Sequence, residues 1–121
     1  MDTRTKIIGL DQLPVDDKVR FASGRFDILT AEHCRALADL AAKGEPVVAL
    51  VEADRDGADC VLDERSRAHL VAALGAVSRV VICDRIEREG LLEAPNAASI
   101  TDIEQQVQRN VVSDVLTRHD R

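Results

Sequence analysis

The chain has 121 residues, of which 45% are hydrophobic and 31% charged, a balance typical of one globular domain over residues 1–121. The formal net charge is −6 and the only aromatic side chains are two phenylalanines, so a nucleic-acid partner is not expected. No apolar run is long enough to cross a membrane, and the amino-terminal residues carry no leader pattern, so we expect a cytoplasmic protein without a membrane partner.

The three cysteines are Cys34, Cys60 and Cys83. Their number is odd and their spacing is wide, which fits neither a disulfide framework nor a C-x-x-C metal or redox pair. We therefore expect reduced thiols, most of them buried.

The first two predicted elements are a strand and a helix. Residues 19–23 form a short apolar segment of strand length. From 31 to 43 the apolar side chains recur with helical spacing, which predicts a helix with one apolar face. Gly44 and Pro46 indicate where this helix ends.

Two more apolar segments, 47–51 and 80–83, enclose a second predicted helix. Both segments are apolar at every position, as is typical of strands covered on both faces in a parallel sheet. Between them, residues 64–77 have helical spacing with Leu70 on the apolar face, and Asp63 is placed to cap the first turn. The order β-α-β-α-β with right-handed crossovers predicts a doubly wound α/β fold.

The last third of the chain predicts three further elements. Residues 85–92 suggest a short helix and residues 97–100 a fourth strand. A long amphipathic helix then begins at a capping box formed by Thr101 and Glu104. Its apolar stripe over 103–116 would either cover the sheet or join two copies of the chain in a homodimer.

The turn between the first predicted strand and the first predicted helix is the candidate binding site. A strand that ends at a glycine and leads into a helix directs backbone N–H groups and the positive end of the helix dipole at one point, where anions bind. Residues 24–33 read GRFDILTAEH. This segment resembles the G-x-F-D-x-x-[H/T]-x-G-H signature of the HxGH nucleotidyltransferases.

The resemblance extends beyond this turn, over about two-thirds of the chain. Residues 6–13 resemble the segment before the first strand in the adenylyltransferase domain of the ADP-heptose synthases. Residues 52–54 resemble that family's strand end with its aspartate, and residues 67–81 follow its second helix and third strand.

The resemblance implies a three-layer, Rossmann-like parallel sheet and a transfer reaction. A nucleotidyl group would pass from ATP or CTP to a phosphorylated sugar or alcohol, with Mg²⁺ and release of pyrophosphate. Thr30 and His33 would be catalytic contacts at the α- and β-phosphates, because His33 can donate a hydrogen bond to oxygens whose charge grows in the transition state. Asp27 and Asp54 would be the candidates near the metal ion.

The resemblance also implies a nucleotide-binding set. Its members are Gly24, Arg25, Phe26, Asp27 and Arg67. Arg25 would either bind an incoming phosphate or form an ion pair with a nearby acidic side chain, and both alternatives stay open.

Glu32 departs from the signature, which has glycine at this position. A carboxylate about 4 Å from a phosphate charge costs on the order of 1 kcal/mol in water and several at a shielded site, which would weaken nucleotide binding. A glutamate in the first turn of any helix is also favourable to the helix dipole. Glu32 could therefore be structural, or could swing outward or ligate Mg²⁺ in a working site.

Two further departures concern the phosphates. The loop from 53 to 63 is rich in aspartate, where members of the family have lysines that bind the phosphate of the acceptor. The family's late S-S-T-x-x-R segment, which helps to hold the triphosphate, is absent. The sequence thus leaves two functions open. One is a nucleotidyltransferase, and the other is a catalytically degenerate relative that acts as a nucleotide-binding, regulatory or protein-interaction module.

Overall fold

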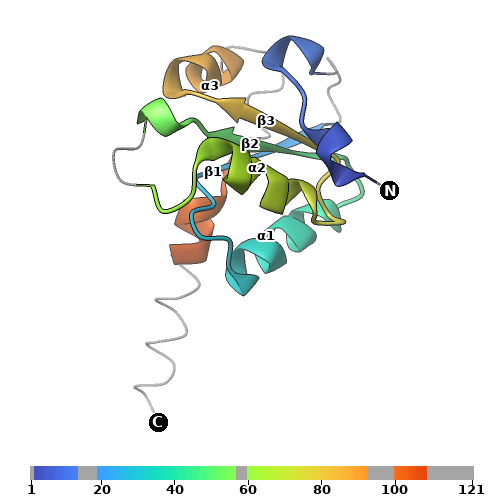
Figure 1. Ribbon diagram of the computed structural model, residues 1–121. Coiled ribbons are helices and arrows are strands. Elements are labelled where there is room, and N and C mark those ends of the chain that lie inside the picture. The colour runs from blue at the N-terminus through green and yellow to red at the C-terminus, as the bar shows by residue number, and fades with distance from the viewer. Residues whose placement is uncertain (1, 14–18, 57–59, 93–99, 109–121) are drawn as a thin grey trace.

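A four-stranded parallel sheet forms the centre of the computed structural model, which describes residues 2–13, 19–56, 60–92 and 100–108 (Figure 1). The strand order is β3-β2-β1-β4, and each neighbouring pair runs parallel. The strands are β1 (Arg20–Gly24), β2 (Val47–Glu52), β3 (Arg79–Cys83) and β4 (Ile100–Asp102).

Helices cover both faces of this sheet. They are α1 (Ala31–Ala41), α2 (Glu64–Ala72) and α3 (Arg85–Leu92), with short 3-10 turns η1 (Thr3–Lys6), η2 (Leu10–Gln12) and η3 (Asp54–Asp56), and residues 103–108 are helical. Figure 1 shows α1 and α2 on one side of the sheet and α3 on the other. Within the ranges described, no helix has the length and apolar character needed to span a bilayer.

Each face of the sheet buries its own apolar layer. On one face, Leu37 of α1 and Val71 of α2 pack over Val51 and the neighbouring strand positions. On the other face, Leu91 of α3 and the amino-terminal segment pack over alternate positions that include Leu50. Since β2 is buried at five of its six positions, its side chains are apolar on both faces. The predicted three-layer α/β architecture is confirmed.

The three predicted strands and the helix at 85–92 are confirmed, with boundaries that shift by at most one residue. The first helix also forms as predicted, although α1 ends at Ala41 rather than at 43. Beyond its end the chain turns at Gly44, whose φ of +92° is a conformation that other residues rarely adopt.

The second helix is shorter than predicted, and one residue of its predicted buried face is exposed. It is capped by Asp63 as expected, with the Asp63 carboxylate accepting the Ser66 N–H at 2.7 Å. It ends at Ala72 rather than at 77, and the following turn brings Val77 into the core. Leu70, predicted on the buried face, is 43% exposed, because the buried face of α2 carries Arg67 and Ala68 together with Val71.

The fourth strand lies later than predicted. It spans Ile100–Asp102, so only residue 100 overlaps the predicted segment, whose residues 97–99 lie outside the described ranges. The helical turns that follow are capped by Asp102, which accepts the Gln105 N–H at 3.1 Å. The predicted capping box of Thr101 and Glu104 is therefore wrong: Thr101 belongs to β4, and Glu104 makes contacts elsewhere.

The strand order fixes where a ligand site would lie. After β1 the chain crosses to β2 on one side, and β4 pairs with β1 on the other side. The carboxyl ends of β1 and β4 therefore flank the point at which the strand order reverses, where open α/β sheets have their binding crevice.

Candidate functional site

Three N–H groups converge on one point between the carboxyl ends of β1 and β4. They belong to the backbone of Arg25, the backbone of Phe26 and Nε2 of His33, and we call them the anion cradle. The point is occupied by the carboxylate of Glu104. Its Oε1 accepts the Arg25 N–H at 3.1 Å and the Phe26 N–H at 2.8 Å, and His33 Nε2 lies 3.1 Å from Oε1 and 3.0 Å from Oε2.

The loop after β1 is shaped by Gly24 and Phe26. Phe26 has a φ of 54° and a completely buried ring, whose centroid lies 5.7 Å from that of His33. A Cβ atom on Gly24 would lie 2.8 Å from Cζ of this ring and 3.3 Å from Oε1 of Glu104. Glycine is needed at position 24 because both the ring and the carboxylate approach the backbone closely.

Thr30 orients the imidazole of His33 from the other side. The Thr30 backbone N–H donates to His33 Nδ1 at 3.1 Å, and the Thr30 hydroxyl oxygen lies 2.8 Å from the same nitrogen. Because Nδ1 accepts hydrogen bonds, the ring proton is on Nε2, which donates to Glu104. Thr30 also caps α1, and this local geometry places His33 in the first turn of the helix.

Glu104 reaches the cradle from the helical turn that follows β4. Ile103 beside it is buried in the core, while the Glu104 side chain is 39% exposed. The cradle satisfies this carboxylate with three donors, as expected for an anion at a helix start and a turn of backbone N–H groups. The structure thus contains an anion site whose anion comes from the chain itself.

Arg67 lies beneath the same loop and is completely buried. Its Nη1 donates to the carbonyl oxygens of Arg25 at 2.9 Å and of Glu52 at 2.8 Å, and its Nε to that of Leu62 at 3.0 Å. Its Nη2 forms an ion pair with Asp54 at 2.6 Å. With these contacts Arg67 joins the carboxyl ends of β1 and β2 to the start of α2, and its contact with a phosphate stays a prediction.

The two predicted metal ligands are engaged with other parts of the chain. Asp27 accepts the N–H groups of Val61 at 2.7 Å and Leu62 at 3.0 Å. Asp54 is paired with Arg67. Their role as magnesium ligands stays a prediction, and the described residues contain no cluster of three or more His, Cys, Asp or Glu side chains suited to a metal ion.

The environment of Asp27 also affects its protonation. Burial on its own would raise the pKa of Asp27, but the N–H groups of Leu62 and Val61, assisted by the guanidinium groups of Arg67 and Arg25, outweigh it. The pKa of Asp27 therefore lies below its ordinary value, and the carboxylate holds the 61–62 segment against the loop after β1.

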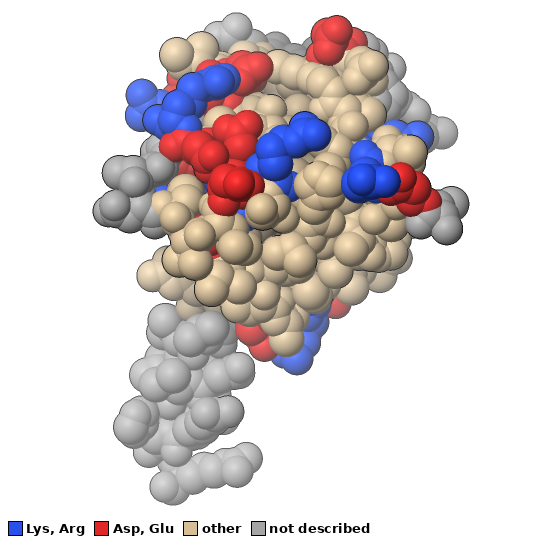
Figure 2. Space-filling model, viewed as in Figure 1, with Lys and Arg blue, Asp and Glu red and all other residues tan. Residues whose placement is uncertain are grey.

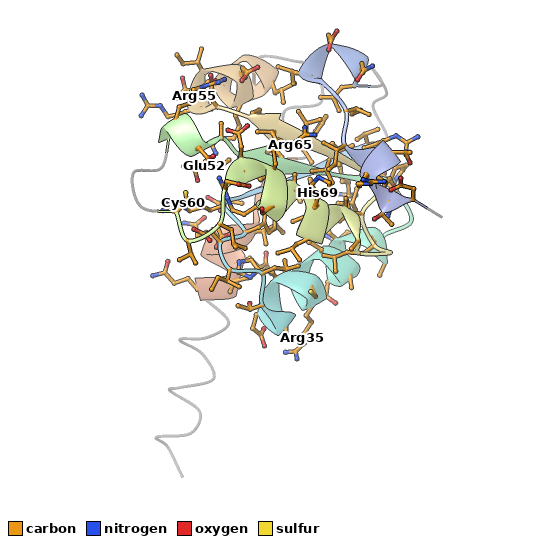
Figure 3. All side chains as sticks on the ribbon, viewed as in Figure 1. Arg35, Glu52, Arg55, Cys60, Arg65 and His69 are labelled. Carbon is orange, nitrogen blue, oxygen red and sulfur yellow. The ribbon has the colours of Figure 1, made fainter. Side chains whose placement is uncertain are left out.

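Arg25 and Glu32 both direct their side chains to partners other than the cradle. Arg25 Nη2 lies 3.4 Å from Sγ of Cys60, and this contact is the main reason why the pKa of Arg25 is raised. Glu32 pairs with Arg35 at 2.8 Å, and Arg35 points outward from α1 in Figure 3. The negative charge at the cradle is thus that of Glu104, while the carboxylate of Glu32 is paired with Arg35.

The cysteines are free, as predicted, but only Cys83 is buried, while Cys34 and Cys60 are partly exposed. The expectation of mostly buried thiols is therefore wrong for two of the three. Cys34 lies on α1, whose buried face is formed by neighbouring residues such as Leu37.

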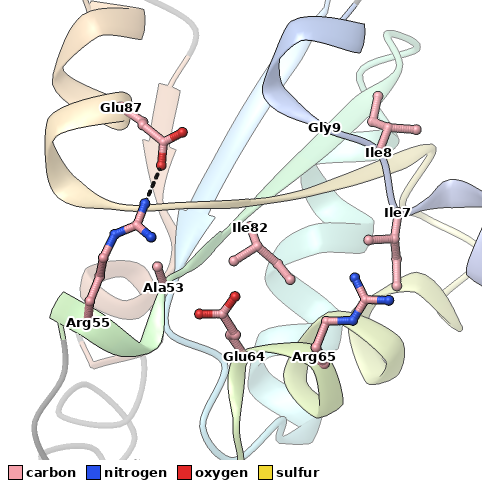
Figure 4. Close-up of a pocket in the computed structure, with 9 residues that line it drawn as sticks. All are labelled: Ile7, Ile8, Gly9, Ala53, Arg55, Glu64, Arg65, Ile82 and Glu87. Atoms are coloured by element: carbon pink, nitrogen blue, oxygen red, sulfur yellow. Dashed lines mark hydrogen bonds and ion pairs between the residues drawn. The ribbon is translucent and has the colours of Figure 1, made fainter.

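A separate hollow of about 390 Å³ lies beside β3, between the start of α2 and the amino-terminal segment (Figure 4). Arg65 of α2 and Ile7 line it, and Arg55 forms an ion pair there with Glu87 at 2.8 Å. In Figure 2, lysine, arginine and acidic side chains are interspersed over this face. None of the cradle residues lines this hollow.

Glu104 is the site residue that sequence reasoning missed. It is 71 positions from His33 along the chain, and its local pattern matched a helix cap. The signal that could have revealed it is its place two residues after β4, at the strand end next to β1, once the strand order is known. The segment 24–33, by contrast, contains all three donors of the cradle.

The fold is similar to that of a solved lipopolysaccharide core biosynthesis protein from Thermoplasma volcanium GSS1. The TM-score is 0.55 and the sequence identity 27%, over 61% of this chain and 64% of that chain. The match thus spans less than two-thirds of either chain. No family model and no curated protein matches this sequence. The four-stranded parallel sheet flanked by helices is consistent with a Rossmann-like nucleotidyltransferase fold.

Proposed function

We propose that this chain is a catalytically degenerate nucleotidyltransferase-like domain that acts as a regulatory or interaction module. The observation that carries this proposal is the Glu104 carboxylate, which accepts all three hydrogen bonds of the anion cradle. In a nucleotidyltransferase the same donors would serve phosphate oxygens, whose charge they stabilise during transfer. Here a side chain of the protein takes that role.

The position of Glu104 opposes nucleotide binding in two ways. The carboxylate would repel a phosphate that approached within about 4 Å, by several kcal/mol at a shielded site. It is also tethered to the fold, so it competes at an effective concentration in the millimolar range or above. A free nucleotide would have to displace it with contacts elsewhere.

The partners of Asp27 and Asp54 within the chain support the same proposal. Phosphoryl and nucleotidyl transfer depend on positioning and on charge neutralisation by Mg²⁺. Among the described residues, the carboxylates of Asp27 and Asp54 serve backbone N–H groups and Arg67 instead. Both aspartates thus stabilise the loops of this domain.

A second candidate function is nucleotidyl transfer itself, because the loop frame for it is present. Gly24, Phe26 and His33 shape an anion site at the switch point of the sheet. The Glu104 side chain is 39% exposed and could rotate outward. The partners would then be ATP or CTP, Mg²⁺ and a phosphorylated sugar or alcohol, and the similar protein named for lipopolysaccharide core biosynthesis makes a sugar phosphate the first acceptor to test.

The apolar stripe of the last helix was predicted either to cover the sheet or to join two copies of the chain in a homodimer. Ile103 is 1% exposed and Val107 packs against the core, so the described part of the stripe covers the sheet. The part from 109 to 116 lies outside the described residues. A homodimer through that part remains a proposal, which sedimentation of the purified chain would test.

Pyrophosphate release separates the two candidate functions. The purified chain is incubated with ATP or CTP, Mg²⁺ and a panel of sugar and alcohol phosphates, and we expect no release above that of a His33→Ala control. Binding is measured in parallel by melting temperature. The chain contains no Trp or Tyr, so nucleotide retained after gel filtration is also visible near 260–280 nm. Pyrophosphate release that His33→Ala abolishes would show that the domain is a transferase.

A further inference from the structure

We infer that Glu104 is an exchangeable internal ligand, so that a free phosphoryl anion in the cradle and the docked position of the 103–108 turns exclude each other. This inference rests on the proposed function and adds its regulation. The ligand class is a small anion with phosphate oxygens, and inorganic pyrophosphate is the probe. The device would convert anion binding into release of the segment that follows β4.

The contacts of Glu104 support exchange rather than permanent burial. Its carboxylate takes three hydrogen bonds from the cradle, yet more than a third of the side chain is exposed to solvent. The cradle donors are all N–H groups, so they accept any oxygen anion of suitable size. Two of them are backbone groups, whose positions do not depend on the identity of the anion.

The donors keep their geometry when the anion changes, because other residues hold them. The carbonyl of Arg25 is bonded to Arg67, and His33 Nδ1 is held by Thr30. The buried ring of Phe26 fixes the loop between them. Removal of Glu104 would therefore leave a formed cradle with three unpaired N–H groups.

The link to the following segment comes from the position of Glu104 in the chain. It lies two residues after the end of β4, a strand of three residues that pairs only with β1 in the described sheet. Ile103 and the Glu104 carboxylate both attach this turn to the domain. Displacement of the carboxylate removes one of these attachments, and by linkage the anion and the docked turn weaken each other equally.

The test compares pyrophosphate binding by the wild type, Glu104→Gln, Glu104→Ala and Glu32→Gln, without added metal ion. Binding is followed by NMR through the amide signals of Arg25 and Phe26. We expect pyrophosphate to bind at least tenfold more tightly to both Glu104 variants than to the wild type. Glu32→Gln removes the same charge from the start of α1 and should stay within about threefold of the wild type.

Hydrogen exchange supplies the second readout. Pyrophosphate at a concentration that saturates the Arg25 and Phe26 shifts should accelerate exchange of the wild-type amides at 103–108 severalfold. In Glu104→Gln these amides should exchange faster already, with little further change. This readout separates an exchangeable ligand from a general effect of charge.

Several outcomes would overturn the inference. They are equal pyrophosphate affinity in folded Glu104 variants and wild type, an equal gain in Glu32→Gln, and unchanged exchange at 103–108 when the cradle is saturated. Loss of folding in Glu104→Gln, which is nearly isosteric, would also overturn it, since an exchangeable ligand must be dispensable for the fold. Pyrophosphate release from ATP or CTP by the wild type would instead overturn the proposed function, which keeps the two failures distinct.

Discussion

Arg67 and Glu104 bind opposite ends of the same peptide unit. The carbonyl oxygen of Arg25 accepts from Arg67 Nη1 at 2.9 Å, and the N–H of Phe26 donates to Glu104 Oε1 at 2.8 Å. The buried cation thus lies on one side of this peptide and the anion on the other. Because the two hydrogen bonds polarise the peptide in the same direction, each strengthens the other. The buried Arg67 side chain therefore helps to orient the N–H groups of the cradle.

Replacement of Arg67 should be among the most damaging changes in the domain. Arg67→Met would leave three carbonyl oxygens and Asp54 without their donor. A buried acceptor left unpaired typically costs about 1–3 kcal/mol of unfolding free energy, whereas the Asp54 side chain is 43% exposed and can be hydrated. Urea denaturation followed by circular dichroism measures this change. Arg67→Lys should be intermediate, because one ammonium group cannot serve acceptors in four places.

The matched control for Arg67 lies two residues earlier on the same helix. Arg65 is exposed, and within the described part of the chain its side chain has no polar partner, so Arg65→Met should change the unfolding free energy by no more than about 0.5 kcal/mol. If Arg65→Met and Arg67→Met were equally harmful, the loss could not be assigned to the buried contacts of Arg67.

Gly24→Ala should destabilise the loop after β1. The new methyl group would lie 2.8 Å and 2.9 Å from two ring carbons of Phe26, which is fully buried and cannot move aside freely. Overpacking of this kind costs about 1–3 kcal/mol. Gly75→Ala is the control, since nothing lies within 4 Å of its added Cβ, and it should be neutral or slightly stabilising. A neutral Gly24→Ala variant would contradict the close approach.

The elements that the sequence predicts well are those whose pattern is local and whose environment is uniform. The segments at 47–51 and 80–83 are apolar at every position because both faces of β2 and β3 are covered. Leu70 was misplaced because α2 buries a face that carries an arginine, and apolar spacing does not detect a charge satisfied by four acceptors. The ion pair of Arg67 with Asp54 joins residues 13 positions apart in the sequence, so no local pattern reveals it.

The loop that forms the candidate site could be predicted from the sequence, but the residue that fills the site, Glu104, could not. Residues 24–33 carry the glycine, the left-handed turn and the histidine in one continuous segment. Glu104 is brought to that segment only by the pairing of β4 with β1, so its role depends on tertiary structure. Three positions before it, Thr101 offered a plausible local capping pattern, but Asp102 provides the cap and leaves Glu104 available for the cradle.

The protonation state of the His33 ring gives a prediction that does not depend on binding or activity. Because Nδ1 accepts from the Thr30 N–H, the neutral ring should carry its proton on Nε2. Long-range ¹H–¹⁵N correlation spectra of the histidines distinguish the two tautomers directly. His69, which lines a surface hollow on α2, is the internal reference in the same spectrum. A His33 signal with the proton on Nδ1 would exclude the hydrogen bonds described for Thr30 and Glu104.

The lowered pKa of Asp27 predicts how acid affects stability. A carboxyl group whose folded pKa is below its unfolded value of about 3.9 stabilises the fold fully above that value. The contribution is lost as the pH falls through the folded pKa, since protonation weakens the bonds from the Leu62 and Val61 N–H groups. Asp27→Asn should therefore lower the melting temperature at pH 7 and reduce its fall between about pH 5 and pH 2.

Asp39→Asn is the control for this pH dependence, because Asp39 is exposed on α1 and its side chain forms no hydrogen bond or ion pair within the described ranges. Its melting temperature should follow that of the wild type across the same pH range. An Asp27→Asn profile parallel to the wild type would mean that the contact between Asp27 and the 61–62 segment contributes nothing to folding.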